Sequence, residues 1–513
     1  MHWGFDVLGW AIGFVMALAV ASWWGHRSYR RFLQKARGPK SAALALDLTT
    51  PLDLLLDPLT RQHPGQNALM TLLDNADAFA ARAMSTAQAG RSLDLMYYIW
   101  RTDLAGLLLI DALLAAADRG VRVRLLLDDV NVQSFDRTFL ALGQHPMIEV
   151  RLFNPTRNRG MALRRGVEMA LGLHRFNRRM HGKLWLADGR LAVVGGRNIG
   201  DTYFGVLNGG TISIDADVML VGPKVTEVEA VFDSYWNLGL SLPIAALWPA
   251  FRVSSTRFRR RLARRVGVAA SAGFLERSLA GRSAELILTQ RLRWTDKVEV
   301  LADPPDKAYG EQSDSWISTA ITAILASAKQ EVRLITPYFV PGQAGSAGLV
   351  SLLKRGAKLY LMTNALSSTD KVLVYGAYRH YRQPLLTAGA RIFEYAKPAR
   401  TGSKRQVLHS KIFVIDGCQA LVGSPNFDMR SAFTNTELGL LFQEPQIVSE
   451  LATLFDDLSA PRNAYEVTHT EAGLRWAVDR PGLPPIMTVE PEATRARRAV
   501  SWFVGHLPIQ SYL

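Results

Sequence analysis

Two distant histidine-lysine pairs have the residue types and the spacing needed to act on a phosphodiester. They repeat one pattern, His-x-Lys-x4-Asp, at His181, Lys183 and Asp188 and again at His409, Lys411 and Asp416. Cleaving a phosphodiester without a metal requires a nucleophile, a proton donor for the leaving oxygen and fixed positive charge around the phosphoryl oxygens. Two imidazoles and two ammonium groups provide that set. Residues two apart on a strand share a face, so each histidine is expected beside its lysine.

The pairing of the motifs makes a chance match implausible. One such pattern should arise by chance in on the order of a percent of chains of this length. Here Asn198 and Asn426 also follow the histidines of their two halves at the same interval. Asn198, Asn426 and the hydroxyl of Ser424 can donate hydrogen bonds to phosphoryl oxygens, and the glycines beside them would let the backbone approach closely.

A histidine nucleophile needs its second ring nitrogen held by an acceptor. An acid enters an apolar strand in each half, and we predict that Asp217 orients His181 and that Glu437 orients His409. Ordinary strand-edge carboxylates are the alternative interpretation of both acids. For the Asp188 and Asp416 carboxylates, a structural role in the turn before the following glycine is an equally good interpretation as a catalytic one.

The elements around the motifs are also duplicated. In the first half, a strand-like run at 92–100, helical apolar spacing at 104–118, an Arg-Gly break and a strand at 121–127 follow one another. In the second half, the same order recurs at 331–339, around 349–354, at another Arg-Gly break and at 357–362. Each half is a β-α-β unit, which predicts an α/β protein with parallel or mixed sheets covered by helices.

The composition indicates a globular chain with a polyanionic partner. Hydrophobic residues make up 48% of the 513 residues, and 60 Lys and Arg against 45 Asp and Glu give a formal charge of +15. Such an excess favours a membrane surface or nucleic acid as the partner, and charge alone does not choose between them. Cys418 is the single cysteine, which excludes an intrachain disulfide and makes a cysteine-based metal site improbable.

The N-terminal segment predicts a membrane anchor. Val7–Trp24 is an uncharged apolar run with three tryptophans, followed by a basic segment that reaches Lys40. About 20 apolar residues cross a bilayer, so the run is near the lower limit for a transmembrane helix. A cleaved signal peptide is the alternative, since Ala19-Val20-Ala21 resembles a cleavage site. The basic flank on the C-terminal side predicts a cytoplasmic catalytic part.

Two further basic segments have open interpretations. The stretch from 243 to 297 is rich in arginine and is either a solvated linker between two lobes or a contact to anionic lipid headgroups. Arg495–Leu507 mixes arginine with Trp502 and Phe503, and it lies either on a membrane interface or against the protein body. Arg175, Arg178 and Arg179, directly before His181, either form a solvated cluster or bind a lipid headgroup.

The paired motifs, with GSPNFDMRSAFTNTE after the second and GGRNIGD after the first, resemble the phospholipase D superfamily. LDLMYYIWRTD, RGVRVRLLLDDVN, FNRRMHGK and TPYFVPG are similar to the bacterial cardiolipin synthases, especially the C-type. The resemblance implies two pseudo-twofold-related α/β/α lobes with both histidines in one central cleft, no metal and no cofactor. We therefore expect an anchor at 1–45, a first lobe at 46–242, the linker at 243–297, a second lobe at 298–470 and a tail at 471–513.

The resemblance also implies an activity. By the usual assignment in the family, His181 forms a phosphohistidine intermediate, His409 is the acid and base, and Lys183, Lys411, Asn198 and Asn426 hold the phosphoryl group. A phosphatidyl group would pass from phosphatidylglycerol or phosphatidylethanolamine to a second phosphatidylglycerol, giving cardiolipin at the bacterial inner membrane. The alternatives are a phospholipase D hydrolase, a nuclease and a non-catalytic lipid-binding protein. An anionic membrane and phospholipids are the expected partners, without nucleic acid, and the sequence leaves open an accessory protein.

Overall fold

The structure of the chain is a computed structural model. It describes residues 3–206, 210–248, 253–271, 273–274, 276, 288–311, 313, 316–396 and 405–507. Parts of the predicted anchor, linker and tail therefore lie outside the described residues.

The first lobe is built on a mixed sheet whose strand order is β10-β1-β8-β6-β5-β2-β3-β4-β9. β2, β3 and β4 run parallel to one another, and the other neighbours in the sheet pair antiparallel. The strands are β1 (Asn67–Leu72), β2 (Ser92–Tyr97), β3 (Arg122–Asp128), β4 (Ile148–Phe153), β5 (Leu184–Ala187), β6 (Leu191–Gly195), β8 (Asp217–Val221), β9 (Ser241–Pro243) and β10 (Arg293–Thr295).

The second lobe repeats this sheet with the order β11-β20-β18-β17-β12-β14-β15-β21-β22-β23. From β11 to β21 each strand matches its counterpart from β1 to β9 in position and direction, so the predicted duplication is confirmed. The strands are β11 (Val298–Ala302), β12 (Glu331–Ile335), β14 (Lys358–Asn364), β15 (Arg391–Tyr395), β17 (Ile412–Ile415), β18 (Gln419–Gly423), β20 (Leu438–Phe442), β21 (Ala464–Thr470), β22 (Gly473–Ala477) and β23 (Ile486–Met487).

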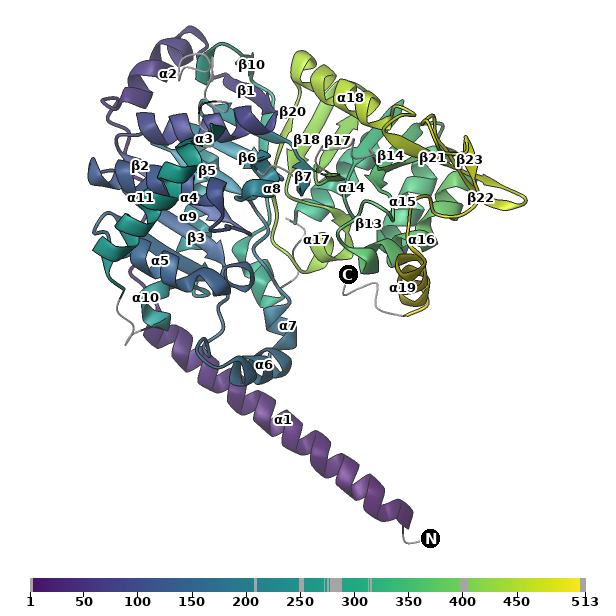
Figure 1. Cartoon of the computed structure of the whole chain (residues 1–513), viewed down its shortest axis with the longest axis horizontal. Coiled ribbons are helices and arrows are strands. Elements are labelled where there is room, and N and C mark those ends of the chain that lie inside the picture. Colours follow the sequence, from purple (N-terminus) through teal and green to yellow (C-terminus); the bar gives the residue numbers. More distant parts are fainter. Residues whose placement is uncertain are drawn as a thin grey trace.

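Helices cover both faces of each sheet, and Figure 1 shows the two lobes side by side. The predicted helix at 104–118 is α4, which begins after the N-cap Asp103 and ends before Gly120 at φ 95°. In the first lobe and its N-terminal extension lie α1 (Trp3–Ala36), α2 (Pro51–Gln62), α3 (Asn75–Gln88), α4 (Leu104–Asp118), α5 (Asp136–Leu142), α6 (Ala162–Leu171), α7 (Leu173–Phe176), α8 (Asp201–Phe204), α9 (Val225–Trp236), α10 (Ile244–Leu247) and α11 (Ser255–Ser271).

The second lobe has a matching helical layer. Short 3₁₀ segments occur at Asp129–Asn131, Gln133–Phe135 and Pro305–Tyr309. The α-helices of this lobe are α14 (Ile317–Ser327), α15 (Gly342–Lys354), α16 (Val372–Thr387), α17 (Met429–Phe433), α18 (Pro445–Ser459) and α19 (Arg495–Gly505).

The lobes share a hydrophobic core. One cluster of buried side chains joins the inner faces of both sheets to α9 and α18, with Phe232 and Phe455 among its members. Separate clusters lie under α3, α4 and α5 on the outside of the first sheet and under α14, α15 and α16 on the outside of the second. Because the apolar inner faces pack on one another, the two lobes are held in one fixed relation.

Two short strand pairs add to this arrangement. β7 (Thr211–Ile214) of the first lobe runs parallel to β16 (Arg405–Leu408) of the second, and β13 (Phe339–Val340) pairs with β19 (Phe427–Asp428). An isolated bridge joins Met180 to Thr436. Each lobe thus sends a segment that ends at its motif histidine to the edge of the other lobe.

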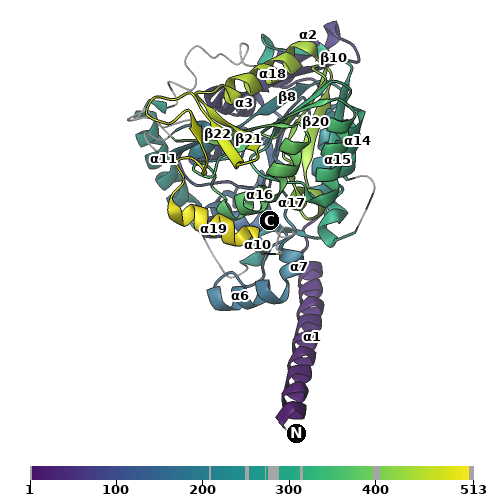
Figure 2. The ribbon, with the colours of Figure 1, turned by 90° about the vertical axis from the view of Figure 1, so that its right-hand side faces the viewer.

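The N-terminal segment forms α1, which projects from the body with its N-terminal end farthest away (Figures 1 and 2). Among the described residues, the structure has no helix whose length and apolar character would suffice to cross a membrane. The transmembrane helix predicted at Val7–Trp24 is therefore not confirmed.

The arginine-rich segment and the C-terminal tail lie against the lobes where they are described. α11 packs on α4, and Arg259 forms a 2.8 Å ion pair with Asp118. In the tail, β22 and β23 extend the second sheet and α19 packs against α16, with Val504 buried. Trp502 and Phe503 remain exposed on α19.

Candidate active site

The two motif histidines are each held by an acid of the opposite lobe. His181 Nδ1 lies 2.8 Å from Glu437 Oε2 and 3.0 Å from Oε1. His409 Nδ1 lies 2.5 Å from Asp215 Oδ2. The backbone repeats this exchange, because the N–H groups of His181 and His409 donate to the carbonyls that immediately precede these acids, at 2.8 Å each. One composite site therefore contains both imidazoles.

The predicted partners of the imidazoles were wrong in both halves. Asp217 makes buried ion pairs with Arg82 at 2.8 Å and Arg197 at 2.9 Å, and Glu437 serves His181 rather than His409. Asp215 is the structural counterpart of Glu437: Gly195 of β6 pairs with Asp217, whereas Gly423 of β18 pairs with Gly439. Asp215 and Asp217 differ by one strand period, so the sequence pattern could not separate them.

Both motif lysines are buried beside their histidines, as the spacing predicts. The Lys183 Nζ donates to the carbonyl oxygen of His181, and the Lys411 Nζ donates to that of His409. The β-strands begin only after the lysines, at Leu184 and Ile412. Burial lowers the pKa of both ammonium groups, most strongly that of Lys183. An anionic phosphoryl group bound between the two lysines would stabilise their charged forms in this poorly hydrated site.

The electrostatic surroundings lower the pKa of both imidazoles. Burial, followed by the charges of Lys183 and Lys411, lowers the pKa of His181 well below its ordinary value. Burial and Lys411 also lower the pKa of His409, but the Asp215 carboxylate opposes the shift. Burial tends to raise the pKa of Asp215, yet His409 and Lys411 overcome it and lower the pKa. His409 is consequently the better proton carrier of the two.

Glu437 is fixed by hydroxyl groups. Ser424 Oγ donates to its Oε2, and Ser431 Oγ donates to its Oε1 at 2.7 Å. Ser424 Oγ also accepts the Leu438 N–H at 3.0 Å. The prediction that Ser424 binds phosphate is therefore corrected, because its proton is already used within the protein. Ser424 instead positions the acid behind His181.

The two asparagines differ in their surroundings. Asn198 Oδ1 accepts the Ile99 N–H at 3.1 Å, and its Nδ2 donates to Tyr203 Oη at 3.2 Å. These bonds connect β2 to the segment after β6, so Asn198 is used to hold the fold together. Asn426 Oδ1 is buried with no hydrogen-bond partner among the described residues. The side-chain amide of Asn426 therefore has unused hydrogen-bonding capacity. The role of Asn426 as a phosphoryl ligand stays a prediction.

The terminal aspartates of both motifs are in turns. Asp188 and Asp416 have left-handed backbones, at φ 54° and 51°, directly before glycines. The Asp188 carboxylate accepts the backbone N–H groups of Gly90, Arg91 and Ser92 at 2.8 to 2.9 Å. Asp416 accepts the equivalent groups of residues 329–331 at 2.7 to 2.9 Å. The structure thus favours the turn interpretation over the catalytic one for both residues.

Two tyrosines beside the imidazoles were not among the predicted site residues. Tyr98 packs edge-on against His181 with ring centroids 4.9 Å apart, and Tyr203 packs in the same manner against His409 at 5.5 Å. Tyr98 lies in the YYIW segment that follows β2, where an aromatic at the carboxyl end of a strand could have identified it. Asp215 and Ser431 were also missed: Asp215 meets His409 only when the lobes dock, and Ser431 meets Glu437 through the local turn of the second lobe after β19.

Comparison with known proteins identifies the family. The model of the cardiolipin synthase, PLD-like domain matches residues 82–236 and 321–459, one match in each lobe. Cardiolipin synthase C of Escherichia coli is 35% identical over 88% of this chain and 98% of its own length. The chain belongs to this family. It is an enzyme of the cardiolipin synthase, PLD-like group.

Other relatives extend the comparison. An uncharacterised protein of Helicobacter pylori is 32% identical over 80% of this chain and 82% of its own length. Cardiolipin synthase 1 of Bacillus anthracis is 26% identical over 75% of this chain and 65% of its own length. The crystal structure of a phosphatidylserine synthase from Haemophilus influenzae has a TM-score of 0.57 at 13% identity, covering 89% of this chain and 99% of that one. That likeness supports the fold of the two-lobed cardiolipin synthase-like enzyme.

Proposed function

We propose that the enzyme makes cardiolipin by transferring a phosphatidyl group from phosphatidylglycerol or phosphatidylethanolamine to a second phosphatidylglycerol, through a phosphohistidine. The observation that supports this proposal most directly is the pair of imidazoles, each with its Nδ1 atom hydrogen-bonded to a carboxylate. Among the described residues, neither Nε2 takes part in a hydrogen bond, so both are available to substrate. The relatives named cardiolipin synthase support this choice of product.

We assign His181 as the nucleophile. Its pKa is lowered well below the ordinary value, because burial and two lysines disfavour the charged ring, so its Nε2 carries a lone pair at neutral pH. In the first step this Nε2 attacks the phosphorus of the donor lipid. The bond from phosphorus to the headgroup oxygen breaks, and the protonated His409 transfers its proton to that oxygen.

The second step runs through the same two rings. Neutral His409 removes a proton from a hydroxyl group of the acceptor phosphatidylglycerol, and the resulting oxygen attacks the phosphohistidine. The bond from phosphorus to nitrogen breaks, which restores His181 and leaves His409 protonated for the next donor. Asp215 stabilises the imidazolium of His409, and Lys183 and Lys411 stabilise the phosphoryl oxygens in both transition states.

Location and partners complete the proposal. We place the enzyme at the inner membrane of a bacterium with its catalytic part in the cytoplasm, acting on phospholipids within an anionic bilayer and not on nucleic acid. The net charge of +15 supports attraction to such a surface.

The decisive experiment identifies the products. Purified full-length enzyme is incubated in mixed micelles with labelled phosphatidylglycerol, with and without phosphatidylethanolamine, and the lipids are identified by mass. Cardiolipin is expected, and the headgroup released, glycerol or ethanolamine, identifies the donor. Phosphatidic acid without cardiolipin would instead establish a hydrolase with water as the acceptor.

A further inference from the structure

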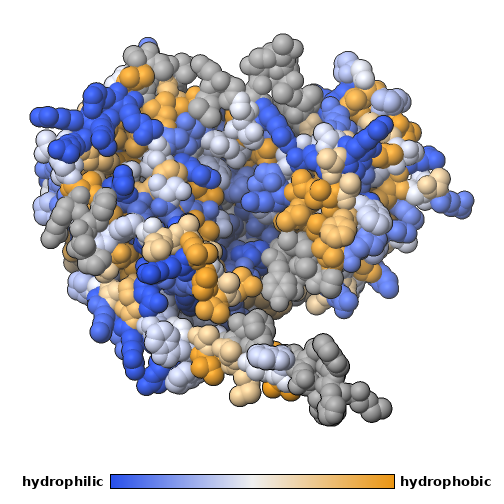
Figure 3. Space-filling model, turned by 60° about the horizontal axis from the view of Figure 1, so that its bottom comes forward, coloured by the Kyte–Doolittle hydropathy of each residue, from blue (hydrophilic) through white to orange (hydrophobic). Residues whose placement is uncertain are grey.

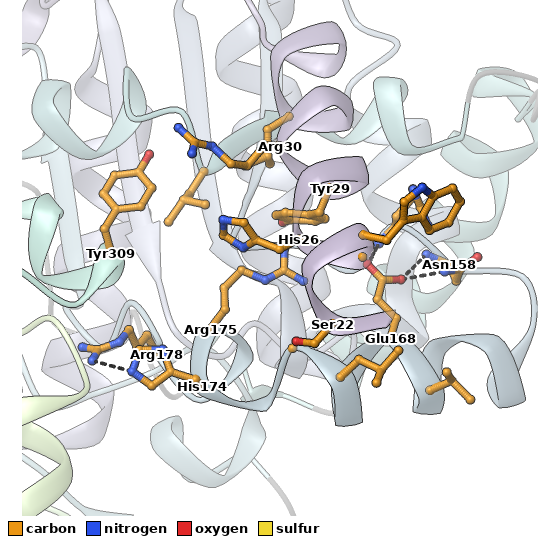
Figure 4. Close-up of a pocket in the computed structure, with 18 of the residues that line it drawn as sticks. Ser22, His26, Tyr29, Arg30, Asn158, Glu168, His174, Arg175, Arg178 and Tyr309 are labelled. Carbon is orange, nitrogen blue, oxygen red and sulfur yellow. Dashed lines mark hydrogen bonds between the residues drawn. The ribbon is translucent and has the colours of Figure 1, made fainter. Parts of the chain in front are cut away.

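A lipid-sized cavity lies apart from the two histidines, where α1 meets α6 and α7 (Figure 4). Its volume is about 1220 Å³, and its lining includes neither motif histidine and neither motif lysine. Ligand pockets commonly measure about 300 to 1,000 Å³, so this cavity has room for more than a small anion. Residues of α1 between Ala21 and Gln34 line it, at the end of this helix that meets the body (Figure 2).

The lining of the cavity is strongly basic. Among the described residues of the lining, the acids are Glu168 and Glu311. Both oxygens of Glu168 are already used, because they accept the N–H groups of Arg157 and Asn158 at 2.9 Å. The arginines of the lining are Arg30, Arg37, Arg157, Arg164, Arg175 and Arg178. An excess of cations in a partly enclosed space favours an anionic ligand.

Two of these guanidinium groups have donors without acceptors. Arg175 Nη1 and Arg178 Nε are buried atoms with no hydrogen-bond partner in the described part of the chain. Burial lowers the pKa of both arginines, so a bound anion would stabilise their charged forms. A phosphate group fits such donors, because guanidinium nitrogens bind its oxygens in a charge-assisted manner.

The lining of the cavity also contains apolar side chains. Leu163, Val167 and Leu171 follow one another at intervals of four on α6, and all three are exposed. Leu33 of α1 and Leu240 also line the cavity. Figure 3 shows hydrophobic side chains on this face of the molecule around a hydrophilic hollow between the lobes. Exposed aliphatic side chains beside a cluster of cations match a molecule with an acyl chain and a phosphate.

We propose that this cavity binds one anionic phospholipid, with its phosphate at Arg175 and Arg178 and an acyl chain along α6 and α1. The site would hold a lipid beside the segment that leads to His181, since Arg178 lies three residues before it. Arg178 also donates to the Lys307 carbonyl of the second lobe at 3.1 Å. The proposal is independent of the reaction, because occupancy requires neither imidazole.

Neighbouring arginines on α1 provide a matched test. Arg30 lines the cavity and Arg31 does not, and both are exposed. Binding of dioctanoyl phosphatidylglycerol to the full-length His181→Ala protein is measured by equilibrium methods, with and without Arg30→Glu or Arg31→Glu. Arg30→Glu is expected to weaken binding about tenfold and Arg31→Glu to leave it within about twofold. Equal effects of the two reversals would overturn the proposal.

Inorganic phosphate and dioctanoyl phosphatidylcholine are the ligand controls. The proposal requires both to bind at least about tenfold more weakly than dioctanoyl phosphatidylglycerol, since each lacks either the acyl chains or the net negative charge. Phosphate binding as tight as the lipid would mean an anion site and would overturn the lipid assignment.

The position of the acyl chain is tested by photo-crosslinking. Phosphatidylglycerol with a diazirine on its acyl chain is irradiated with the enzyme in mixed micelles, and the labelled peptides are mapped. Label is expected within 161–172 and 21–34, and Val167→Asp should reduce it severalfold, whereas Leu173→Asp, exposed but outside the lining, should not. Label confined to the peptides of His181 and His409, or equal loss in both variants, would refute the site.

Discussion

The acids behind the imidazoles decide how the site works at the scale of single residues. Asp215 faces His409, and its lowered pKa keeps its carboxylate ionised. Asp217, two residues later, instead forms ion pairs with Arg82 and Arg197. The first acid supports a proton carrier, and the second satisfies two buried cations. Replacing Asp215 should therefore lower activity, whereas replacing Asp217 should lower stability.

Asp215→Asn is expected to lower kcat by about 10² to 10⁴, because it removes the charge that stabilises the imidazolium of His409. Asp217→Asn should instead lower the free energy of unfolding by about 3 to 5 kcal/mol, since it leaves buried arginines uncompensated. Steady-state kinetics and chemical denaturation separate the two effects. A stable Asp217→Asn protein without activity would contradict the assignment.

The covalent intermediate tests the roles of the histidines. With labelled donor lipid and acid-free quenching, label should be trapped on the peptide of His181 in the wild type. It should be absent from His181→Ala and persist longer in His409→Ala, which lacks the base for the second step. Mapping by mass spectrometry checks this order, and label on His409 would reverse the assignment.

At the scale of secondary-structure elements, the spacing that the two motifs share reflects a turn as well as chemistry. Asp188 and Asp416 accept backbone N–H groups from the segments that begin β2 and β12. They tie two strands together at the end opposite to the histidine of the same motif. Each motif thus has a histidine for catalysis at its first position and an aspartate that stabilises a turn at its last.

Asp188→Ala should lower the free energy of unfolding by about 1 to 3 kcal/mol, because it leaves three N–H groups without acceptors. The kcat of the folded protein should remain within about twofold of wild type. Asp188→Asn, which keeps an acceptor and tolerates the left-handed backbone, is the control. Denaturation and kinetics on the same preparations distinguish this outcome from loss of a catalytic group.

The Asp416 turn should depend on pH. Burial tends to raise the pKa of Asp416, but the N–H groups of Lys329, Glu331 and Gln330 outweigh it and lower the pKa. A carboxyl group with a lower pKa in the folded state stabilises the fold above its unfolded pKa of about 3.9. That contribution disappears as the pH falls through the folded pKa. The Tm difference between wild type and Asp416→Asn should accordingly shrink below about pH 4.

At the scale of the whole molecule, the site exists only between the lobes. Lys411 of the second lobe lowers the pKa of His181 in the first, and each imidazole takes its acid from across the interface. The shared core under α9 and α18 fixes this geometry. Electrostatic coupling across the lobes is therefore a measurable property of the fold.

Lys411→Met should raise the pKa of His181, because one of the charges that disfavour its protonated form is removed. Attack requires the neutral ring, so the acid limb of phosphoenzyme formation should move to higher pH. Single-turnover rates across pH measure the shift, with the exposed Lys371→Met as control. An unchanged limb would show that Lys411 does not act on His181.

Much of this molecule followed from sequence, and the misassigned site residues have one cause. The α4 helix and the strands around it are local, since Asp103 caps the helix and Gly120 ends it. The membrane span, in contrast, is not confirmed among the described residues. Ser424 was misassigned because its partner, Glu437, becomes a neighbour only after folding.

The sequence by itself determined the two His-Lys pairs, the duplicated α/β units and the presence of acids near the start of β8 and β20. Those features depend on residue type and on periods of two or 3.6 along the chain. Only the tertiary structure decided that Glu437 serves His181 and that Asp215, rather than Asp217, serves His409. The physical reason is that residues two apart on a strand share a face, and docking of the lobes alone determines which of them reaches an imidazole.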